Sequence, residues 1–447
     1  MRGSEAVKKG LYLKNIDKDN ILAIDPDNVF WGITNKLGKE DLFLPENLLS
    51  LYRDKQEACN KEMQGIRFSE ELTAVYIDPT DLCNANCPYC YVPSENRLKG
   101  RSMTQEELNY ILEKIYKYSK INKRKLVIVF HASEPLLVKD IVFKAIEKFK
   151  GCFYFGIQTN ALLLEKDDAE FIKRNNVSIG ISLDAADMLT NNRLRVSRGS
   201  GGNFKKAVQA IGWFKGYKGL NVITTMTKFN IAKLAQLVRF LHRKEVGCVL
   251  INPVRLTQKN SRFLRPDDSI MAKNFIKAVE EALKLSMRSK HKIIIGNFAN
   301  VILAIAAPSA RRLMCDISPC GGGRCFFTIT ASGEMIPCGE FIGLKGFSAG
   351  NIFKRSIESA IKSPQFKKIR SRFVEKIPVC DVCLLRNICG CPCPAELHNL
   401  GDMYKKSVFC EFYKEIISYA FKLISQDREK YCLRPEGLGS LEYLYKI

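Results

Sequence analysis

Three cysteines at C-x3-C-x2-C spacing are the residues of this chain with the clearest potential for metal chemistry. Cys83, Cys87 and Cys90 stand in the segment DLCNANCPYCY, directly after the apolar residues AVYID. A closed structural zinc site usually takes four ligands, often from two C-x2-C pairs. Neither a histidine nor a fourth cysteine lies within twenty residues of this loop, so a fourth ligand would have to come from elsewhere in the chain. Three thiolates from one loop suit an iron–sulfur cluster that leaves one iron open to a small ligand.

A second group of cysteines lies in the last third of the chain. Ten of the seventeen cysteines fall between Cys315 and Cys410, and they include the spacing C-x2-C-x5-C-x3-C from Cys380 to Cys393. The opening residues lack the apolar stretch of a signal peptide, so we expect a cytoplasmic protein in which disulfides would be reduced. Dense cysteine in that setting indicates metal or redox chemistry. Four isolated cysteines are expected to be small buried apolar residues: Cys59, Cys152, Cys248 and Cys432.

The composition is that of a globular protein with an excess of positive charge. With 447 residues, of which 46% are hydrophobic and 26% charged, the chain is long enough for two or three domains. It has no apolar run of the ~18 residues that a membrane-spanning helix needs. The net charge of +23 is spread along the chain. This charge fits solvated surface lysines, but it would also attract acidic peptides, acidic redox carriers or nucleic acid.

Strand-like and helical segments alternate through the middle of the chain. Six apolar runs of strand length stand at residues 73–78, 125–131, 152–160, 177–184, 219–226 and 247–254. Amphipathic stretches between them predict helices, and Thr104 with Glu107 forms a capping box at the start of the first helix. This alternation predicts a parallel sheet, as a partial barrel or as a doubly wound sheet. In both folds the loops at the carboxyl ends of the strands hold the active site.

The regions on either side of these repeats differ from them in composition. Residues 10–70 predict two or three short strands with Asp- and Asn-rich turns, followed by a helix. Residues 266–287 predict a long amphipathic helix, after which the chain becomes rich in cysteine and glycine. We therefore expect three parts: a small α+β unit at 1–70, a strand–helix domain at 71–305, and a cysteine-rich domain with a helical tail at 306–447.

The cysteine loop and its place after the first strand resemble the radical S-adenosylmethionine (SAM) superfamily. The resemblance implies a partial (β/α)6 barrel whose [4Fe–4S] cluster is held by the three cysteines, with SAM on the open iron. In that family one electron from the cluster cleaves SAM, and the resulting 5′-deoxyadenosyl radical abstracts a hydrogen from the substrate. Tyr89, before the last cysteine of the loop, stands where the family's loop packs near the adenine.

Motifs at later strand ends extend the resemblance. The segment FHASEPLL matches the family's Gly-Gly-Glu-Pro at Glu134 and Pro135, with Ala132 and Ser133 in place of the glycines. An Arg after the fourth strand suits a carboxylate ligand, because guanidinium offers a paired fork of donors. The residues that the resemblance assigns to SAM binding are Tyr89, Glu134, Gln158, Asn160, Ser182, Asp184 and Arg195.

The second group of cysteines resembles the SPASM domain, an extension that carries auxiliary clusters in many peptide-modifying radical SAM enzymes. Gly333, five residues before Cys338, and the later Gly-Asn-Ile at 350–352 also fit its pattern. The resemblance implies two auxiliary [4Fe–4S] clusters, one on Cys320, Cys325, Cys338 and Cys393 and the other on Cys380, Cys383, Cys389 and Cys410. Cys315 and Cys391 are surplus, and either could replace an assigned ligand. A pair of zinc knuckles is the alternative interpretation of the same cysteines.

The resemblance predicts a maturase that forms a thioether or a carbon–carbon crosslink in a ribosomally made precursor peptide. Flavodoxin or ferredoxin would donate the electron, and residues 1–70 would contribute to leader recognition. Sulfatase-maturing relatives carry an Asp after the cysteine that corresponds to Cys338, whereas this chain has Gly339 and then Glu340, a candidate catalytic base. An oxidase of a protein side chain or of a small molecule is the alternative. A zinc-dependent nucleic-acid-binding protein is a more distant one, and we expect neither a membrane nor a nucleic-acid partner.

Overall fold

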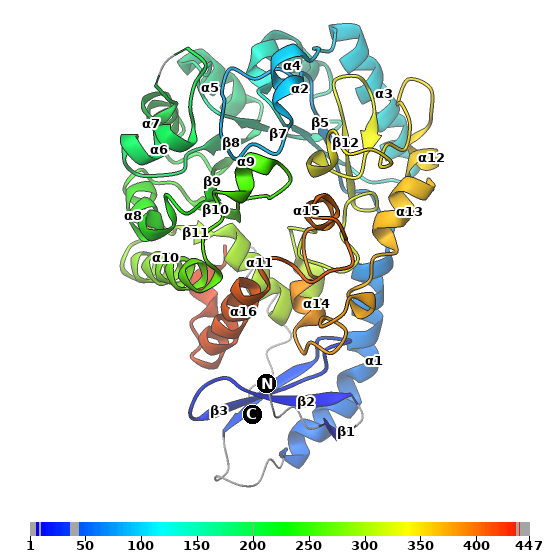
Figure 1. Ribbon diagram of the computed structural model, residues 1–447, viewed down its shortest axis with the longest axis vertical. Helices are drawn as coiled ribbons and strands as arrows, with labels where there is room; N and C mark the ends of the chain where they lie inside the picture. The colour runs from blue at the N-terminus through cyan, green and yellow to red at the C-terminus, as the bar shows by residue number, and fades with distance from the viewer. Residues whose placement is uncertain (1–5, 9, 36–43, 200, 435–437, 439–447) are drawn as a thin grey trace.

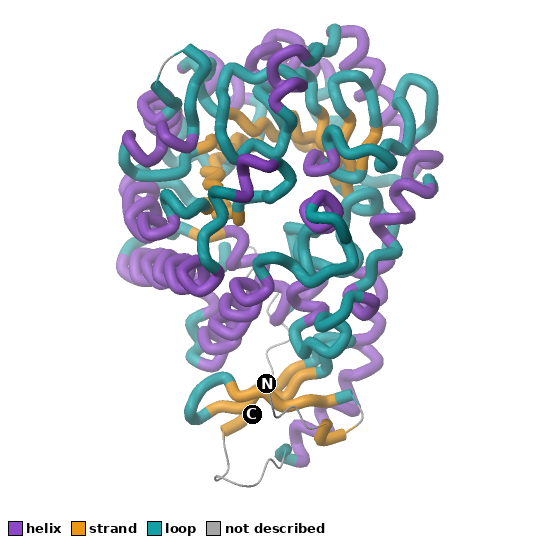
Figure 2. The backbone as a smooth tube through the Cα atoms, in the orientation of Figure 1, coloured by secondary structure: helices purple, strands orange, loops and turns teal. Residues whose placement is uncertain are grey.

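The computed structural model describes residues 6–8, 10–35, 44–199, 201–434 and 438. Figure 1 shows a strand–helix domain at the top, the N-terminal sheet at the bottom, and the cysteine-rich segments between and beside them. Helices lie around the outside of the upper sheet, and long loops fill its inner side (Figure 2). No helix in the described part of the chain is long and apolar enough to cross a membrane.

The large sheet has nine strands in the order β11-β10-β9-β8-β7-β6-β5-β12-β13. Neighbours are parallel from β11 to β12, and β13 pairs antiparallel with β12. All six predicted strands are present, as β5 (Ala74–Ile77), β6 (Val127–Phe130), β7 (Tyr154–Thr159), β8 (Ser178–Ser182), β9 (Leu220–Met226) and β10 (Cys248–Pro253). The three added strands are β11 (Ile294–Ile295), β12 (Phe326–Ile329) and β13 (Met335–Ile336). The partial barrel is therefore confirmed, and the cysteine-rich domain extends its open edge.

The crossover helices follow their strands as expected for parallel pairing. The predicted capping box is formed, because Glu107 N donates to Thr104 Oγ1 at 3.2 Å and Thr104 N donates to Glu107 Oε2 at 2.9 Å. The helices of this domain are α2 (Ser94–Lys99), α3 (Gln105–Ile121), α4 (Lys139–Lys148), α5 (Lys166–Arg174), α6 (Met188–Leu194), α7 (Phe204–Trp213), α8 (Leu234–Arg243), α9 (Lys259–Arg262), α10 (Asp268–Arg288) and α11 (Gly296–Ala306). The long helix predicted at 266–287 is α10.

The N-terminal part is a four-stranded antiparallel meander with one long helix, which is more strand than the two or three predicted. Its elements are β1 (Ala6–Lys8), β2 (Leu11–Asn15), β3 (Asn20–Ile24), β4 (Trp31–Asn35) and α1 (Glu46–Phe68). The cysteine-rich part adds α12 (Ile357–Ile361), α13 (Pro364–Arg370), α14 (Arg386–Cys389), α15 (Pro394–Asn399) and α16 (Cys410–Ser425). Of the isolated cysteines, Cys59, Cys248 and Cys432 are buried as expected, and Cys152 is half-buried.

The three parts share one contiguous apolar core, so the predicted domain boundaries stay a prediction. Trp31 of β4 is 1% exposed, donates from Nε1 to the carbonyl of Ile305 at 2.7 Å, and meets the ring of Phe421 edge-on at 5.8 Å. Arg386 of α14 forms an ion pair with Asp27, in the loop between β3 and β4. The N-terminal sheet is thus fastened to both of the other parts.

Trp31→Ala should lower the free energy of unfolding by about 3–5 kcal/mol, because it empties a buried site and leaves a backbone carbonyl without its donor. Chemical denaturation followed by circular dichroism measures this change. Trp213→Ala is the matched control, since the chain has two tryptophans and Trp213 is only half-buried. Equal losses in the two variants would contradict the anchoring role of Trp31.

Candidate functional site

One cavity of about 370 Å³ lies at the carboxyl ends of the barrel strands. Its wall includes Cys83, Cys87 and Cys90 from the loop after β5. The same wall includes four cysteines of the second group: Cys315, Cys320, Cys338 and Cys393. The two groups are far apart in sequence, yet they face each other across a single space.

The first cysteine loop is held by backbone and guanidinium contacts. The buried guanidinium of Arg97 in α2 donates to the carbonyl of Val92 at 3.1 Å and to Asn86 Oδ1 at 3.3 Å. The amide of Ala85 lies 3.4 Å from the Cys83 sulfur and donates to it. Such N–H contacts orient a ligand sulfur and stabilise negative charge on it.

Burial keeps these thiols neutral when no metal is bound. It raises the pKa of the Cys83 thiol to about 11 and that of Cys87 to about 12. Metal binding must therefore displace their protons. No three Cys, His, Asp or Glu side chains of the described residues come together closely enough to ligate a single ion. The three thiols of this loop fit a [4Fe–4S] cluster that leaves one iron open to a small ligand.

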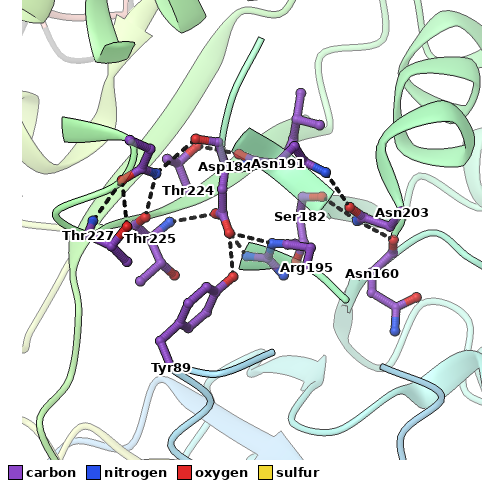
Figure 3. A network of polar contacts seen from close by, with 12 residues as sticks. Tyr89, Asn160, Ser182, Asp184, Asn191, Arg195, Asn203, Thr224, Thr225 and Thr227 are labelled. Carbon is purple, nitrogen blue, oxygen red and sulfur yellow. Dashed lines mark hydrogen bonds and ion pairs between the residues drawn. The ribbon is translucent and has the colours of Figure 1, made fainter. Parts of the chain in front are cut away.

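A buried ion pair joins Arg195 to Asp184 (Figure 3). Arg195 donates to Asp184 twice, from Nε at 2.9 Å and from Nη2 at 3.2 Å, and the Tyr89 hydroxyl donates to the same carboxylate at 2.5 Å. The backbone amide of Thr225 in β9 adds a contact at 2.9 Å. Burial alone would lower the pKa of Arg195, but Asp184, Tyr89 and Cys87 together outweigh it and raise that pKa. Arg195 and Tyr89 line the cavity, whereas Asp184 positions them from outside the wall.

Glu134 also lies behind the wall. It is fully buried and accepts hydrogen bonds from Thr159 Oγ1 at 2.7 Å, Asn160 N at 2.8 Å and Leu136 N at 3.2 Å. Burial raises its pKa to about 7, against the effect of these donors. Among the predicted SAM-binding residues, those that line the cavity are Tyr89, Gln158, Asn160, Ser182 and Arg195. Glu134 and Asp184 support them.

Ala132 and Ser133 stand before Glu134, at the positions where two glycines were expected. Ala132 and Ser133 have φ angles of 55° and 44°, in the left-handed region that favours glycine. The Ser133 hydroxyl donates to the carbonyl of Asp81 at 2.7 Å, so it ties the loop after β6 to the loop after β5. The backbone therefore keeps a glycine-type conformation without glycine.

Cys325 does not line the cavity, unlike the other three cysteines of the ligand set in which it was predicted. It lies directly before β12, and its sulfur accepts a hydrogen bond from Arg324 Nη1 at 3.1 Å. Cys315 instead lies with Cys320, Cys338 and Cys393 at the wall. Cys315, which was left without a cluster, therefore lies at the cavity wall, whereas the assigned Cys325 does not. Spacing alone did not distinguish Cys315 from Cys325.

The outer cysteines Cys380, Cys383, Cys389 and Cys410 lie apart from this cavity. Cys391 accompanies them in the core, where Arg372 donates to its carbonyl at 2.9 Å and to its sulfur at 3.4 Å. Burial is the largest cause of the raised pKa of the Cys389 thiol. Its neighbours raise this pKa further, namely the thiols of Cys391, Cys383 and Cys410. Five thiols therefore lie near one another, and Cys391 is among them.

Glu340 lines the cavity, and so do several polar residues that the sequence did not single out. Burial raises the pKa of Glu340 to about 7, and the guanidinium of Arg255, 3.8 Å away, opposes this shift. His131 and Tyr91 also line the wall. His131 directly follows β6, the same signal that identified the other strand-end residues, so its place could have been inferred from the sequence.

Two family models match the chain. The radical SAM superfamily matches residues 77–241, and an iron–sulfur cluster-binding domain, SPASM, matches residues 320–384. An uncharacterized protein of Archaeoglobus fulgidus is 40% identical over 93% of this chain and 95% of its own length. A cysteine-type anaerobic sulfatase-maturating enzyme of Clostridium novyi is 23% identical, covering 74% of this chain and 90% of that protein. The subtilosin biosynthesis protein AlbA of Bacillus subtilis is 26% identical, covering 75% and 70%.

Solved structures share the fold. The structure of anSMEcpe with bound AdoMet superposes with a TM-score of 0.71 at 18% identity, covering 83% of this chain and 98% of that one. Streptococcus suis SuiB bound to its precursor peptide SuiA gives a TM-score of 0.59 at 15% identity, covering 91% and 99%. At these identities the likeness concerns the arrangement of the chain.

Asp184→Asn should lower the free energy of unfolding by about 3–5 kcal/mol, because it leaves the buried Arg195 guanidinium without its counter-ion. Asp187→Asn is the matched control. Asp187 caps α6 through the amide of Thr190, and Asn caps a helix about as well. The change should therefore cost at most about 1 kcal/mol, for the loss of the partly exposed ion pair with Lys233. Thermal denaturation of the two variants measures the difference, and an equal effect would contradict the importance of the buried pair.

Cys315→Ala should lose about 4 iron per chain, whereas Cys325→Ala should retain the full iron content, because only Cys315 lies at the cavity wall. Iron and sulfide analysis of anaerobically reconstituted protein measures this. The reverse pattern would restore the ligand set predicted from spacing.

Proposed function

The chain belongs to the radical SAM superfamily and carries a SPASM iron–sulfur domain, and from this premise we propose that it is a maturase of a ribosomally made peptide. Radical SAM enzymes use SAM and [4Fe–4S] clusters, so the chain is an enzyme of that chemistry. The alternative of a zinc-dependent nucleic-acid-binding protein is therefore wrong. The peptide substrate and the bond formed are the proposal.

The chain's own residues supply the binding site. We assign the SAM-binding cluster to Cys83, Cys87 and Cys90, and SAM itself to the neighbouring wall residues Tyr89, Gln158, Asn160, Ser182 and Arg195. When bound, the cluster and SAM together supply a 5′-deoxyadenosyl radical for hydrogen abstraction. The surrounding side chains orient SAM and exclude water from the reacting atoms. Asp184 and Glu134 hold Arg195 and Asn160 in place from behind.

The observation that carries the proposal is that the first cysteine loop and four cysteines of the SPASM domain line one cavity. A substrate group in that cavity lies between the two cysteine groups, so an auxiliary cluster there would be near the site of reaction. We place that cluster on Cys315, Cys320, Cys338 and Cys393, and a second, outer one on Cys380, Cys383, Cys389 and Cys410.

Several features favour a peptide as the substrate. AlbA is a bacteriocin biosynthesis protein, and SuiB binds a precursor peptide. Leu189 in α6 and Phe263 after α9 are 85% and 75% exposed, on segments that follow strands β8 and β10 of the barrel. Apolar side chains exposed there offer contacts for an extended chain. The edges of the N-terminal sheet at β1 and β4 offer strand addition for a leader, and the positive charge of the chain favours an acidic leader.

Oxidation of a protein side chain is the alternative, because the chain also resembles sulfatase-maturating enzymes over most of its length. Glu340 is the candidate base for that reaction, since it lies at the cavity wall with a carboxylate oxygen that has no hydrogen-bond partner among the described residues. In both reactions we assign flavodoxin or ferredoxin as the electron donor.

A fractionation experiment separates these substrate classes. Reconstituted enzyme, SAM and dithionite are incubated with three fractions of the native cell extract: small molecules, peptides and folded proteins. We expect the peptide fraction to raise 5′-deoxyadenosine formation and to contain a product lighter by two hydrogens, as a crosslink requires. Stimulation by another fraction alone would contradict the maturase proposal.

The control for this experiment is the triple variant Cys83→Ala, Cys87→Ala and Cys90→Ala. It should form no 5′-deoxyadenosine while keeping about 8 of the about 12 iron of three clusters. Persistent SAM cleavage in this variant would contradict the role of the first loop.

A further inference from the structure

A row of three polar side chains runs from the core to the cavity at the ends of the first two barrel strands. Asp78 follows β5, His131 follows β6, and Tyr91 follows the last cysteine of the first loop. His131 and Tyr91 line the cavity, and Asp78 lies behind His131. None of the assignments above uses these residues.

The inner end of this row holds a carboxylate without hydrogen bonds. Asp78 is 1% exposed, and neither of its carboxylate oxygens has a hydrogen-bond partner among the described residues. The nearest donor is His131 Nδ1, also unpartnered, at 3.7 Å from Oδ1. A buried carboxylate without partners costs several kcal/mol, so a functional reason for it is expected. Catalytic hydrogen bonds are often long before substrate binds and shorten in the complex.

The outer end of the row is a hydrogen bond at the cavity. The Tyr91 hydroxyl lies 3.2 Å from His131 Nε2. The imidazole is held between two aromatic rings, with Tyr76 edge-on at 5.2 Å and Tyr91 stacked at 6.2 Å. Its orientation is therefore fixed, with Nδ1 directed to Asp78 and Nε2 directed to Tyr91.

Gly339 brings the backbone of the SPASM domain against this pair. A Cβ atom at this position would lie 3.2 Å from His131 Cε1 and 3.3 Å from the Tyr91 hydroxyl oxygen. The absence of a side chain there leaves both groups open to the cavity next to Cys338. Tyr91, His131, Gly339 and Cys338 all line the same cavity, so a substrate group bound beside Gly339 can reach the hydroxyl and the imidazole.

We propose that Asp78, His131 and Tyr91 form a proton relay that deprotonates a thiol or hydroxyl group of the substrate bound beside Gly339. Asp78 accepts a hydrogen bond from Nδ1–H, which fixes the tautomer whose Nε2 is free to take a proton. The substrate S–H or O–H bond breaks and leaves its electron pair on sulfur or oxygen. That proton passes to the Tyr91 oxygen while the tyrosine proton passes to Nε2, and Asp78 stabilises the resulting imidazolium.

The relay deepens the proposed function and rests on it, because it names a peptide side chain with a thiol or hydroxyl as the reacting group. Glu340 lies at the wall itself, 3.8 Å from the guanidinium of Arg255, and is the competing proton acceptor there.

The tautomer of His131 tests the relay without a substrate. The chain has four histidines, so holoenzyme labelled with 15N at histidine gives few signals, and the His131→Gln variant identifies those of His131. We expect a protonated Nδ1 and a bare Nε2 in the wild type, and loss of this preference in Asp78→Asn. A protonated Nε2 in the wild type, or a tautomer unchanged in Asp78→Asn, would overturn the relay. The wild-type signal decides even where the variant does not fold.

The peptide fraction that stimulates SAM cleavage gives a second readout. His131→Gln and Tyr91→Phe should lower the peptide product formed per 5′-deoxyadenosine by about 10²–10⁴-fold, the usual contribution of a general base. Glu340→Gln is the comparison variant, and a loss confined to it would overturn the relay in favour of Glu340. Wild-type enzyme that cleaves no SAM would contradict the proposed function itself, whereas SAM cleavage with the wrong His131 tautomer contradicts the relay alone.

Discussion

The parallel pairing of β12 with β5 is the interaction on which the site depends. Phe326 to Ile329 run beside Ala74 to Ile77 in register, and the amide of Thr73 donates to the carbonyl of Cys325 at 2.8 Å. The pairing joins segments about 250 residues apart, and it closes the open edge of the barrel with the start of the SPASM domain. It also brings Cys315, Cys320 and Cys338, which flank β12 and β13, towards the loop after β5. Without it, the cavity would lack one of its two cysteine groups.

Buried arginines give the electrostatic counterpart of this arrangement. Arg97, Arg195, Arg324 and Arg372 are all nearly inaccessible to solvent, and each lies in or beside a cysteine loop. Burial raises the pKa of Cys83 and Cys87 well above neutrality, so these two thiols are neutral without metal. The thiolates of bound clusters would add negative charge close to these guanidinium groups. Cluster binding and stability of the fold are thus coupled through these arginines.

The sequence predicted the parts of the site that depend on local order along the chain. All six strands and the Thr104 capping box followed from periodicity and helix-capping patterns, whereas Gln158, Asn160 and Ser182 were named through the family resemblance. Other features depend on three-dimensional packing, which spacing does not encode. Cys315 and Cys325 are both five residues from Cys320, and only the direction of the chain into β12 separates them. The fourth N-terminal strand was not predicted, because β1 has only three residues and forms by pairing with β2.

The roles of the polar residues show why a motif cannot be read one position at a time. Glu134 matches the Glu of the family's Gly-Gly-Glu-Pro motif. Its carboxylate accepts hydrogen bonds from Thr159, Asn160 and Leu136, so it supports the wall residue Asn160 from behind. Gly339 differs from the Asp of the sulfatase-maturing relatives, but a side chain at that position would press against His131 and Tyr91. A side chain at position 339 and the imidazole of His131 would therefore compete for the same space. An inference of the reaction class from the residue after Cys338 alone would overlook His131, the proposed proton acceptor that lies against Gly339.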